Sequence, residues 1–255
     1  MPSRDDPSPV IVFNPRGSSP YLLLGDHAGR EIPRALGDLG LPPEAMDRHI
    51  AWDIGVAGMG EALARALNAA FIRQRYSRLV IDCNRRLDDP TSAPEVSDGQ
   101  VIPGNHALGP ADLAARRNRI FAPYHAEIAR VLDRRQAAGR TTVIVSLHSF
   151  TPAMQGQVRP WRYGVLHRGD SPFSMRVLAA LRARLGPAAG DNQPYAMDGT
   201  DNTVPLHADA RGLDYLELEV RQDLIADADG QAAEAAFTAG VLAELAQGVG
   251  DGRRP

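Results

Sequence analysis

The sequence predicts an α/β fold: a single three-layer αβα domain in which helices cover both faces of a mixed, mostly parallel sheet. Two observations lead to this prediction. Short apolar runs typical of buried strands alternate with longer helical patterns, and strands separated by helices form mostly parallel sheets. The length of 255 residues is ordinary for one domain of this class, and no internal repeat divides the chain.

The expected strands are short and largely apolar. The clearest are residues 142–147, which are β-branched and then apolar, and residues 216–220, where apolar and charged side chains alternate. Such alternation predicts a strand with one apolar face and one polar face. Further strands are expected at residues 21–24, 70–72, 79–82 and 164–166.

Helical patterns fill the intervals between these strands. We expect helices at residues 53–68, 110–138, 171–185 and 231–246. Asp53 is well placed to cap the first of these helices, and Pro123 is expected to bend the second. The predicted organisation is a loose N-terminal arm at 1–20, one α/β domain at 21–248 and a frayed tail at 249–255.

The composition excludes several classes of function. No stretch approaches the roughly 20 apolar residues of a membrane span, and a net charge of −3 argues against nucleic acid as a partner. All 28 basic residues are arginine, which rules out every mechanism that needs a lysine. The one cysteine, Cys83, is expected to be an inert core thiol. With no apolar secretion signal near the N-terminus, a cytoplasmic location is expected.

Polar side chains follow three of the expected strands at the point where each strand ends. His27 follows residues 21–24, His148 lies at the end of the strand that starts at 142, and Arg85 follows residues 79–82. In parallel sheets, ligands bind beyond the carboxyl ends of the strands, so these side chains are expected to share one cleft.

Two imidazoles and one carboxylate are a ligand set that zinc commonly uses. Asp53 and Glu31 are the candidates for the carboxylate, and Asp26 is a weaker one. Each candidate also has an ordinary structural interpretation. A single histidine is more often a hydrogen-bonded structural residue, and Asp53 is well placed as a helix cap.

Other side chains suit the chemistry of a hydrolase. Arg85 suits a substrate carboxylate, with Asn84 adding an amide, although a salt bridge to a nearby aspartate is the alternative. Glu219 lies on the polar face of residues 216–220, where burial would raise its pKa and suit it to proton transfer. His125 would either donate to a developing oxyanion or only pack, and Arg159 lies in a long loop that would suit a lid.

The motifs, taken in order, resemble the N-formylglutamate amidohydrolase family over about residues 20–225. They are GDHAG at 25–29, AWDIG at 51–55, YSRLVIDCNR at 76–85, PYH at 123–125, SLHSF at 146–150, DNQPY at 191–195 and LELEVRQDL at 216–224. The resemblance implies a hydrolase-like fold similar to that of zinc-dependent exopeptidases. It also implies hydrolysis of the amide C–N bond of a small N-acyl amino acid such as N-formyl-L-glutamate.

The resemblance further implies a role for each site residue. One zinc ion per chain would be held by His27, Asp53 and His148, with Glu31 as the fallback carboxylate. Glu219 would transfer the proton and His125 would assist at the oxyanion. Asn84 and Arg85 would grip one substrate carboxylate and Arg159 a second. The residues to which the resemblance gives a role are His27, Asn84, Arg85, Asp53, His125, His148, Arg159 and Glu219.

Two tracts depart from the histidine-utilisation members of the family. Those enzymes carry Pro-His-Ser-Gly and Gln-Leu-Glu where this chain has DHAG at 26–29 and ELE at 217–219. A different N-acyl amino acid is therefore an alternative substrate. A carboxypeptidase-like exopeptidase and a non-catalytic protein that binds small molecules are the alternative functions.

Overall fold

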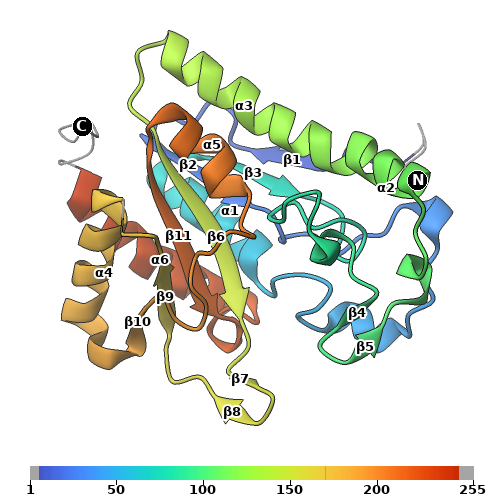
Figure 1. Ribbon diagram of the computed structural model, residues 1–255. Helices are drawn as coiled ribbons and strands as arrows, with labels where there is room; N and C mark the ends of the chain where they lie inside the picture. Colours follow the sequence, from blue (N-terminus) through green and yellow to red (C-terminus); the bar gives the residue numbers. More distant parts are fainter. Residues whose placement is uncertain (1–5, 170, 247–255) are drawn as a thin grey trace.

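A seven-stranded mixed sheet forms the centre of the computed structural model, which describes residues 6–169 and 171–246 (Figure 1). The strand order is β1-β3-β2-β6-β11-β9-β10. The four strands β3, β2, β6 and β11 run parallel. At the edges, β1 pairs antiparallel with β3 and β9 pairs antiparallel with β11, while β10 runs parallel to β9. The strands are β1 (Val10–Phe13), β2 (Tyr21–Gly25), β3 (Ala70–Gln74), β6 (Val143–Phe150), β9 (Tyr163–Leu166), β10 (Ala189–Asp191) and β11 (Asp214–Arg221). The expected mixed, mostly parallel α/β sheet is confirmed.

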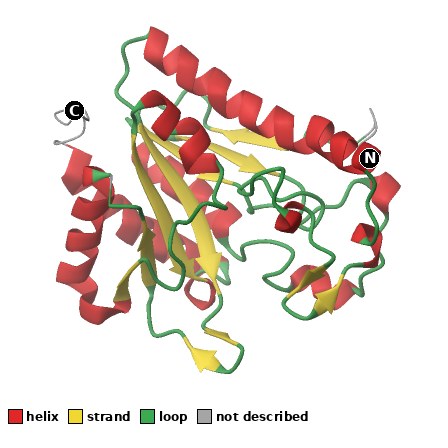
Figure 2. Cartoon of the chain, in the orientation of Figure 1, coloured by secondary structure: helices red, strands yellow, loops and turns green. Residues whose placement is uncertain are grey.

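Helices cover both faces of this sheet (Figure 2). One face carries α1 (Val56–Leu67), α4 (Pro172–Leu185) and α6 (Ala228–Leu245), and the other carries α3 (Ala122–Ala137). Two helices are shorter: α2 (Pro110–Arg116) comes before α3 in the chain, and α5 (Thr203–His207), which comes much later in the chain, contacts α3 in space. Within the two described segments, we find no helix with the length and apolar character needed to cross a bilayer.

The pleat of the strands divides the core into two clusters. Leu22 and Leu24 point to the α3 side of the sheet, whereas Leu23 points to the side of α1, α4 and α6. The same alternation on β11 places Tyr215 in the α3-side core. Glu217 and Glu219, two and four residues further along β11, therefore lie on that same face, beyond the apolar core.

The predicted strand at 79–82 is wrong. Leu79, Val80 and Ile81 are buried in the α3-side core, but their backbone turns, with the Val80 amide donating to the Ser77 carbonyl at 3.0 Å. Side chains satisfy this backbone instead of a neighbouring strand. Arg116 Nη1, for example, donates to the Val80 carbonyl at 2.8 Å. The apolar run reflects burial and not strand pairing.

The predicted start of the first long helix is also wrong. The helix begins at Val56, preceded by Gly55 with a φ of 84°. A Cβ at Gly55 would lie 2.1 Å from the Ile225 carbonyl oxygen, so glycine is required there. Asp53 stands two residues before Gly55 and its side chain does not cap the helix. It is free for another role.

The helix predicted over 110–138 is interrupted just before Pro123. α2 is followed by a π-helical turn at Arg117–Phe121, and α3 then runs to Ala137. Pro123 lacks the amide hydrogen that would continue regular α-helical bonding, which places the expected irregularity in the preceding turn.

Several other segments refine the sequence prediction. Residues 10–13, expected in the loose arm, form β1 and pair with β3. Two small hairpins were not anticipated, β4–β5 (Val96–Ser97, Gln100–Val101) and β7–β8 (Ala153–Met154, Gln157–Val158). The tail predicted at 249–255 lies outside the described residues.

Candidate metal centre and its cleft

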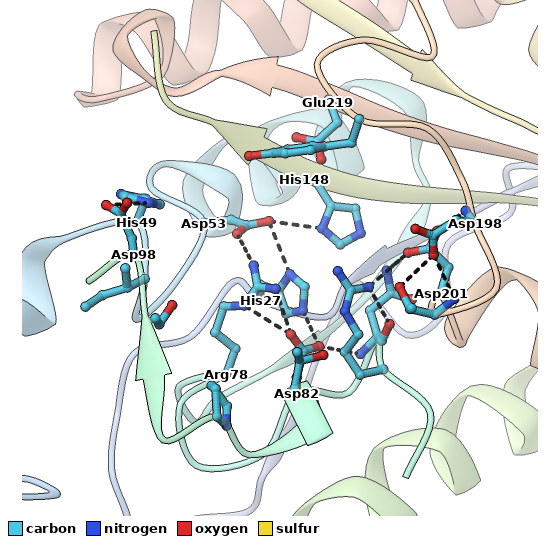
Figure 3. Close-up of a pocket in the computed structure, with 18 of the residues that line it drawn as sticks. His27, His49, Asp53, Arg78, Asp82, Asp98, His148, Asp198, Asp201 and Glu219 are labelled. Atoms are coloured by element: carbon cyan, nitrogen blue, oxygen red, sulfur yellow. Dashed lines mark hydrogen bonds and ion pairs between the residues drawn. The ribbon is translucent and has the colours of Figure 1, made fainter. Parts of the chain in front are cut away.

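A cleft of about 580 Å³ opens beyond the carboxyl ends of the central strands (Figure 3). Most of its lining comes from five parts of the chain: the ends of β2, β6 and β11, residues 49–53, residues 78–85, the β4–β5 hairpin with the residues just before it, and the loop that precedes α5. This is the edge of the sheet at which the sequence predicts a site.

His27, Asp53 and His148 meet at the base of this cleft, and all three are buried (Figure 3). His148 Nδ1 lies 3.0 Å from Asp53 Oδ2, and His27 Nδ1 lies 3.5 Å from the same oxygen. One donor atom from each residue lies within 4.8 Å of the other two. Within the described part of the chain, this is the group whose spacing suits a metal ion.

Local structure explains how the three residues meet. His27 comes two residues after β2 ends, and its carbonyl accepts a hydrogen bond of 2.9 Å from the Asp53 amide, which joins the two loops. His148 lies on β6, on the same face as Ser146. Glu219 on β11 is the parallel-register partner of His148, so the pleat sets these two side chains side by side.

Each imidazole is oriented by contacts on its far nitrogen. His27 Nε2 lies 2.6 Å from Asp82 Oδ1, and Arg78 Nη2 donates to the other Asp82 oxygen at 2.7 Å. His148 Nε2 lies 3.1 Å from Ser146 Oγ. Histidines that bind metals are commonly held in this way by a carboxylate or another polar group. The contacts turn Nδ1 of both rings toward Asp53.

The donor set fits a cation on two observations. His27 Nδ1 is buried and has no hydrogen-bond partner, which is unfavourable unless another group binds it. Burial alone would lower the pKa of His148, but the hydrogen bond and charge of Asp53 raise it to about 10. The surroundings therefore favour positive charge at this point. Two imidazole nitrogens and a carboxylate oxygen form a ligand set that divalent transition-metal ions, zinc among them, commonly use.

Asp53 is ionised in this setting. Burial by itself would raise the pKa of Asp53, but the charge of His27 and the hydrogen bond with His148 hold it well below its usual value. Of the two carboxylates that the sequence left open, the structure brings Asp53 to the histidines. Glu31 lies at the surface instead, where its carboxylate accepts a hydrogen bond of 2.9 Å from Arg75.

Glu217 and Glu219 line the cleft from β11. Both side chains are buried, and Oε2 of each has no hydrogen-bond partner within the described chain. Burial raises the pKa of both carboxyl groups. Glu219 thus has the environment that the sequence predicted for it, next to His148.

Asn84 and Arg85 also line the cleft. Arg85 Nη1 donates to Asp201 Oδ1 at 3.1 Å, and this ion pair replaces the one with a nearby aspartate that the sequence offered as the alternative. The Asn84 side-chain oxygen Oδ1 accepts hydrogen bonds from the backbone amides of Asn202 and Thr203. Asn84 thereby fixes the loop that carries Asp201 to the site.

His125 is not brought to the cleft. It lies on α3, buried behind the lining, where Nε2 lies 3.0 Å from the Cys83 carbonyl oxygen and Nδ1 lies 2.9 Å from His207 Nε2. Cys83 itself is buried, and burial raises its pKa, as expected of a core thiol. The motif with His125 therefore marks packing beneath the site and not a group that faces a substrate.

Arg159 stands behind the lining residue Tyr195. Its guanidinium lies 4.8 Å from the centre of that ring, and Nη1 donates to the Tyr195 hydroxyl at 3.0 Å and to Thr151 Oγ1 at 3.1 Å. The structure does not place Arg159 among the residues that line the cleft.

The residues that sequence reasoning passed over are mainly carboxylates. Asp82 and Arg78 support His27, and their spacing of four residues within one motif was the available signal. Carboxylates outnumber guanidinium groups in the lining by seven to two. The lining carboxylates are Asp53, Asp82, Asp98, Asp198, Asp201, Glu217 and Glu219, and the arginines are Arg78 and Arg85.

Comparison with known proteins places the chain in a family. A family model described as N-formylglutamate amidohydrolase matches residues 19–226. Curated proteins gave no match. Among solved structures, the chain is similar to gene product Atu2144 from Agrobacterium tumefaciens, with 35% identity, a TM-score of 0.93 and coverage of 97% of this chain and 98% of that one. It also has the fold of an N-formylglutamate amidohydrolase from Ralstonia eutropha JMP134, with 21% identity, a TM-score of 0.67 and coverage of 95% and 98%.

Proposed function

Because this chain belongs to the N-formylglutamate amidohydrolase family, we propose that it hydrolyses the amide bond of a small N-acyl amino acid with the help of one zinc ion. The convergence of His27, Asp53 and His148 beside Glu219 carries this proposal. His27 Nδ1, the Asp53 carboxylate and His148 Nδ1 would hold the ion. Zinc at such a site supplies a Lewis acid and lowers the pKa of a bound water toward neutrality.

Glu219 transfers the proton in this proposal. Glu219 lines the cleft and its Oε2 has no hydrogen-bond partner within the described chain, so the carboxylate is available to accept a proton from the attacking water. Addition of the water oxygen to the acyl carbon and cleavage of the C–N bond then require a proton on the leaving nitrogen, and Glu219 returns it there. The products are the free carboxylic acid of the acyl group and the free amino acid.

Arg85 positions the substrate in this proposal. Its hydrogen bonds within the described chain use Nη1, to Asp201 and to the Asn84 carbonyl, which leaves Nε and Nη2 for a carboxylate. A guanidinium presents these two N–H groups side by side and binds a carboxylate in bidentate fashion. The Arg85 guanidinium would fix the α-carboxylate of the substrate while its acyl group reaches the zinc ligands.

A panel of substrates tests the proposed function. The zinc-loaded protein is offered formyl, acetyl and carbamoyl amino acids, N-formyl-L-glutamate included, together with short peptides, and release of the free amino acid is measured. We expect hydrolysis of at least one N-acyl amino acid. Cleavage of peptides alone, or of no compound while zinc is bound, would contradict the proposal.

The role of Glu219 is tested by Glu219→Gln, which removes the base but keeps the shape. We expect the rate to fall by about 10²–10⁴-fold with the zinc content unchanged. Glu95→Gln is the matched control, because Glu95 is an exposed carboxylate that pairs with His106 and does not line the cleft. Normal turnover by Glu219→Gln would remove Glu219 from the mechanism.

A further inference from the structure

We infer that this cleft takes N-acyl amino acids whose side chain carries a positive charge, an amine or a guanidinium, in preference to those with a second carboxylate. The inference rests on the proposed function and names the substrate class for the same site. It is carried by three carboxylates on one wall of the cleft, Asp198, Asp201 and Glu217, and by the shortage of cations to balance them.

Most other carboxylates of the lining already have a cationic partner. Arg78 pairs with both Asp53 and Asp82, at 3.4 and 2.7 Å. Asp98 pairs with Arg48 at 3.0 Å on the opposite side of the cleft (Figure 3). These charges are balanced by the protein itself and do not require a ligand.

Asp198 lacks such a partner. Its Oδ1 accepts hydrogen bonds of 2.7 Å from the Thr200 amide and hydroxyl, which are neutral groups, and no ion pair to it is formed within residues 6–169 and 171–246. Those bonds from Thr200, with a smaller contribution from the charge of Arg85, lower its pKa, so the carboxylate is charged. Asp198 is exposed at the mouth of the cleft and lies beside Asp201, to which its amide donates at 3.0 Å.

Glu217 lines the same cleft and lies close enough to Asp201 for the two carboxyl groups to interact. It is 2% exposed, and its Oε2 has no hydrogen-bond donor in the described parts of the chain. Burial raises the pKa of Glu217 to about 8, so the group is largely protonated without a ligand, and a cationic ligand beside it would favour the ionised form that accepts hydrogen bonds. Within this wall, Arg85 pairs with Asp201 through one nitrogen, which leaves a surplus of negative charge.

A second substrate carboxylate has no matching group here. Arg78 is held by two aspartates, Arg159 stands behind Tyr195, and Arg85 is needed for the α-carboxylate. A glutamate side chain would bring a like charge against Asp198 and Asp201. An amine or guanidinium would instead meet acceptors on that wall, and opposite charges in a partly buried cleft attract strongly.

Binding of the three free amino acid products tests the inference without turnover. We would titrate the zinc-loaded protein with L-arginine, L-citrulline and L-glutamate in a calorimeter. Citrulline has nearly the shape of arginine without its charge. We expect arginine to bind at least about tenfold more tightly than citrulline, and glutamate to bind more weakly than citrulline.

Two variants assign the preference to the wall. Asp198→Asn keeps the hydrogen-bonding shape and should reduce the advantage of arginine over citrulline to less than about threefold, with citrulline affinity unchanged. Glu217→Gln should reduce the same advantage. Asp88→Asn is the matched control, since Asp88 is exposed, pairs with Arg86 and lies outside the lining; it should leave all three affinities unchanged.

Each result has one meaning. Glutamate binding as tightly as arginine, or no binding by any of the three, would overturn the inference. A preference for arginine that Asp198→Asn and Glu217→Gln leave intact would show that the wall does not create it, and would overturn it too. Selective binding of arginine without hydrolysis of any N-acyl amino acid would support the inference and contradict only the proposed function.

Discussion

Two pairs of buried histidines lie at similar separations in this protein but in opposite surroundings. The rings of His27 and His148 are 5.0 Å apart, and those of His125 and His207 are 5.2 Å apart. The first pair faces the carboxylate of Asp53 at the base of the cleft. The second pair lies behind the cleft among aromatic rings and a backbone carbonyl.

The electrostatic consequence is large. The pKa of His148 is raised to about 10 because the contribution of Asp53 outweighs the effect of burial. Burial and the neighbouring His125 instead lower the pKa of His207 to about 3. Burial is common to both pairs, so the carboxylate neighbours make the difference. The pair beside Asp53 therefore favours a cation, whereas the pair without such a neighbour stays neutral and packs in the core.

The largest effect is expected when one histidine is removed from each pair and the zinc content of the variants is compared. His27→Ala or His148→Ala should reduce zinc from about one ion per chain to near zero, because two remaining ligands do not hold zinc firmly. His125→Ala should retain the ion. Metal content by mass spectrometry on the purified variants checks this. If His125→Ala lost as much zinc as His27→Ala and His148→Ala, the two environments would not differ as described.

A smaller effect is expected when the support behind His27 is weakened. Asp82→Asn keeps the volume but removes the negative charge that lies 2.6 Å from His27 Nε2. Loss of such an orienting carboxylate should weaken zinc binding by about 10–100-fold without abolishing it. Competition with a chelator measures the change.

Asp112→Asn is the matched control for Asp82→Asn, since Asp112 lies on the first turn of α2 and away from the cleft. Unchanged zinc affinity in Asp82→Asn would show that Asp82 does not orient the ligand.

The sequence predicted that His27 and His148 share one cleft but left two roles open for His125, and the reason is identifiable. His27 and His148 follow apolar strands, and the edge at which parallel strands end is fixed by the fold class. His125 lies on a helix whose preceding turn is π-helical, so its direction could not be derived from regular helical spacing.

The choice of carboxylate depended on contacts between distant segments. If Asp53 capped the helix, the helix would begin at residue 54. It begins at Val56 instead, after Gly55, and this leaves the Asp53 side chain to reach the histidines. Arg75, which holds Glu31 at the surface, comes from another strand end. Apolar burial alone predicted a strand at 79–82, since local pattern does not show whether side chains or a neighbouring strand satisfy the backbone.

The smallest expected effect concerns stability and pH at the second pair. His207 is neutral when folded, with a pKa of about 3, while its pKa in the unfolded chain is near 6.5. Below pH 6.5 the unfolded state therefore binds the extra proton, and stability falls as the pH falls. Between pH 7 and 5.5 His207 should account for a loss of about 1 kcal/mol in the free energy of unfolding.

Urea unfolding of the native protein and of His207→Gln at both pH values measures this contribution. The variant should lose about 1 kcal/mol less than the native protein on acidification. The same pH dependence in both proteins would mean that His207 is not held neutral by the fold.

The most direct measurement is anomalous diffraction at the zinc edge from crystals of the zinc-loaded protein. The account predicts one ion bound by Nδ1 of His27, a carboxylate oxygen of Asp53 and Nδ1 of His148, with Asp82 still on His27 Nε2. An ion bound at another place, or the two imidazoles directed away from a common ion, would contradict it.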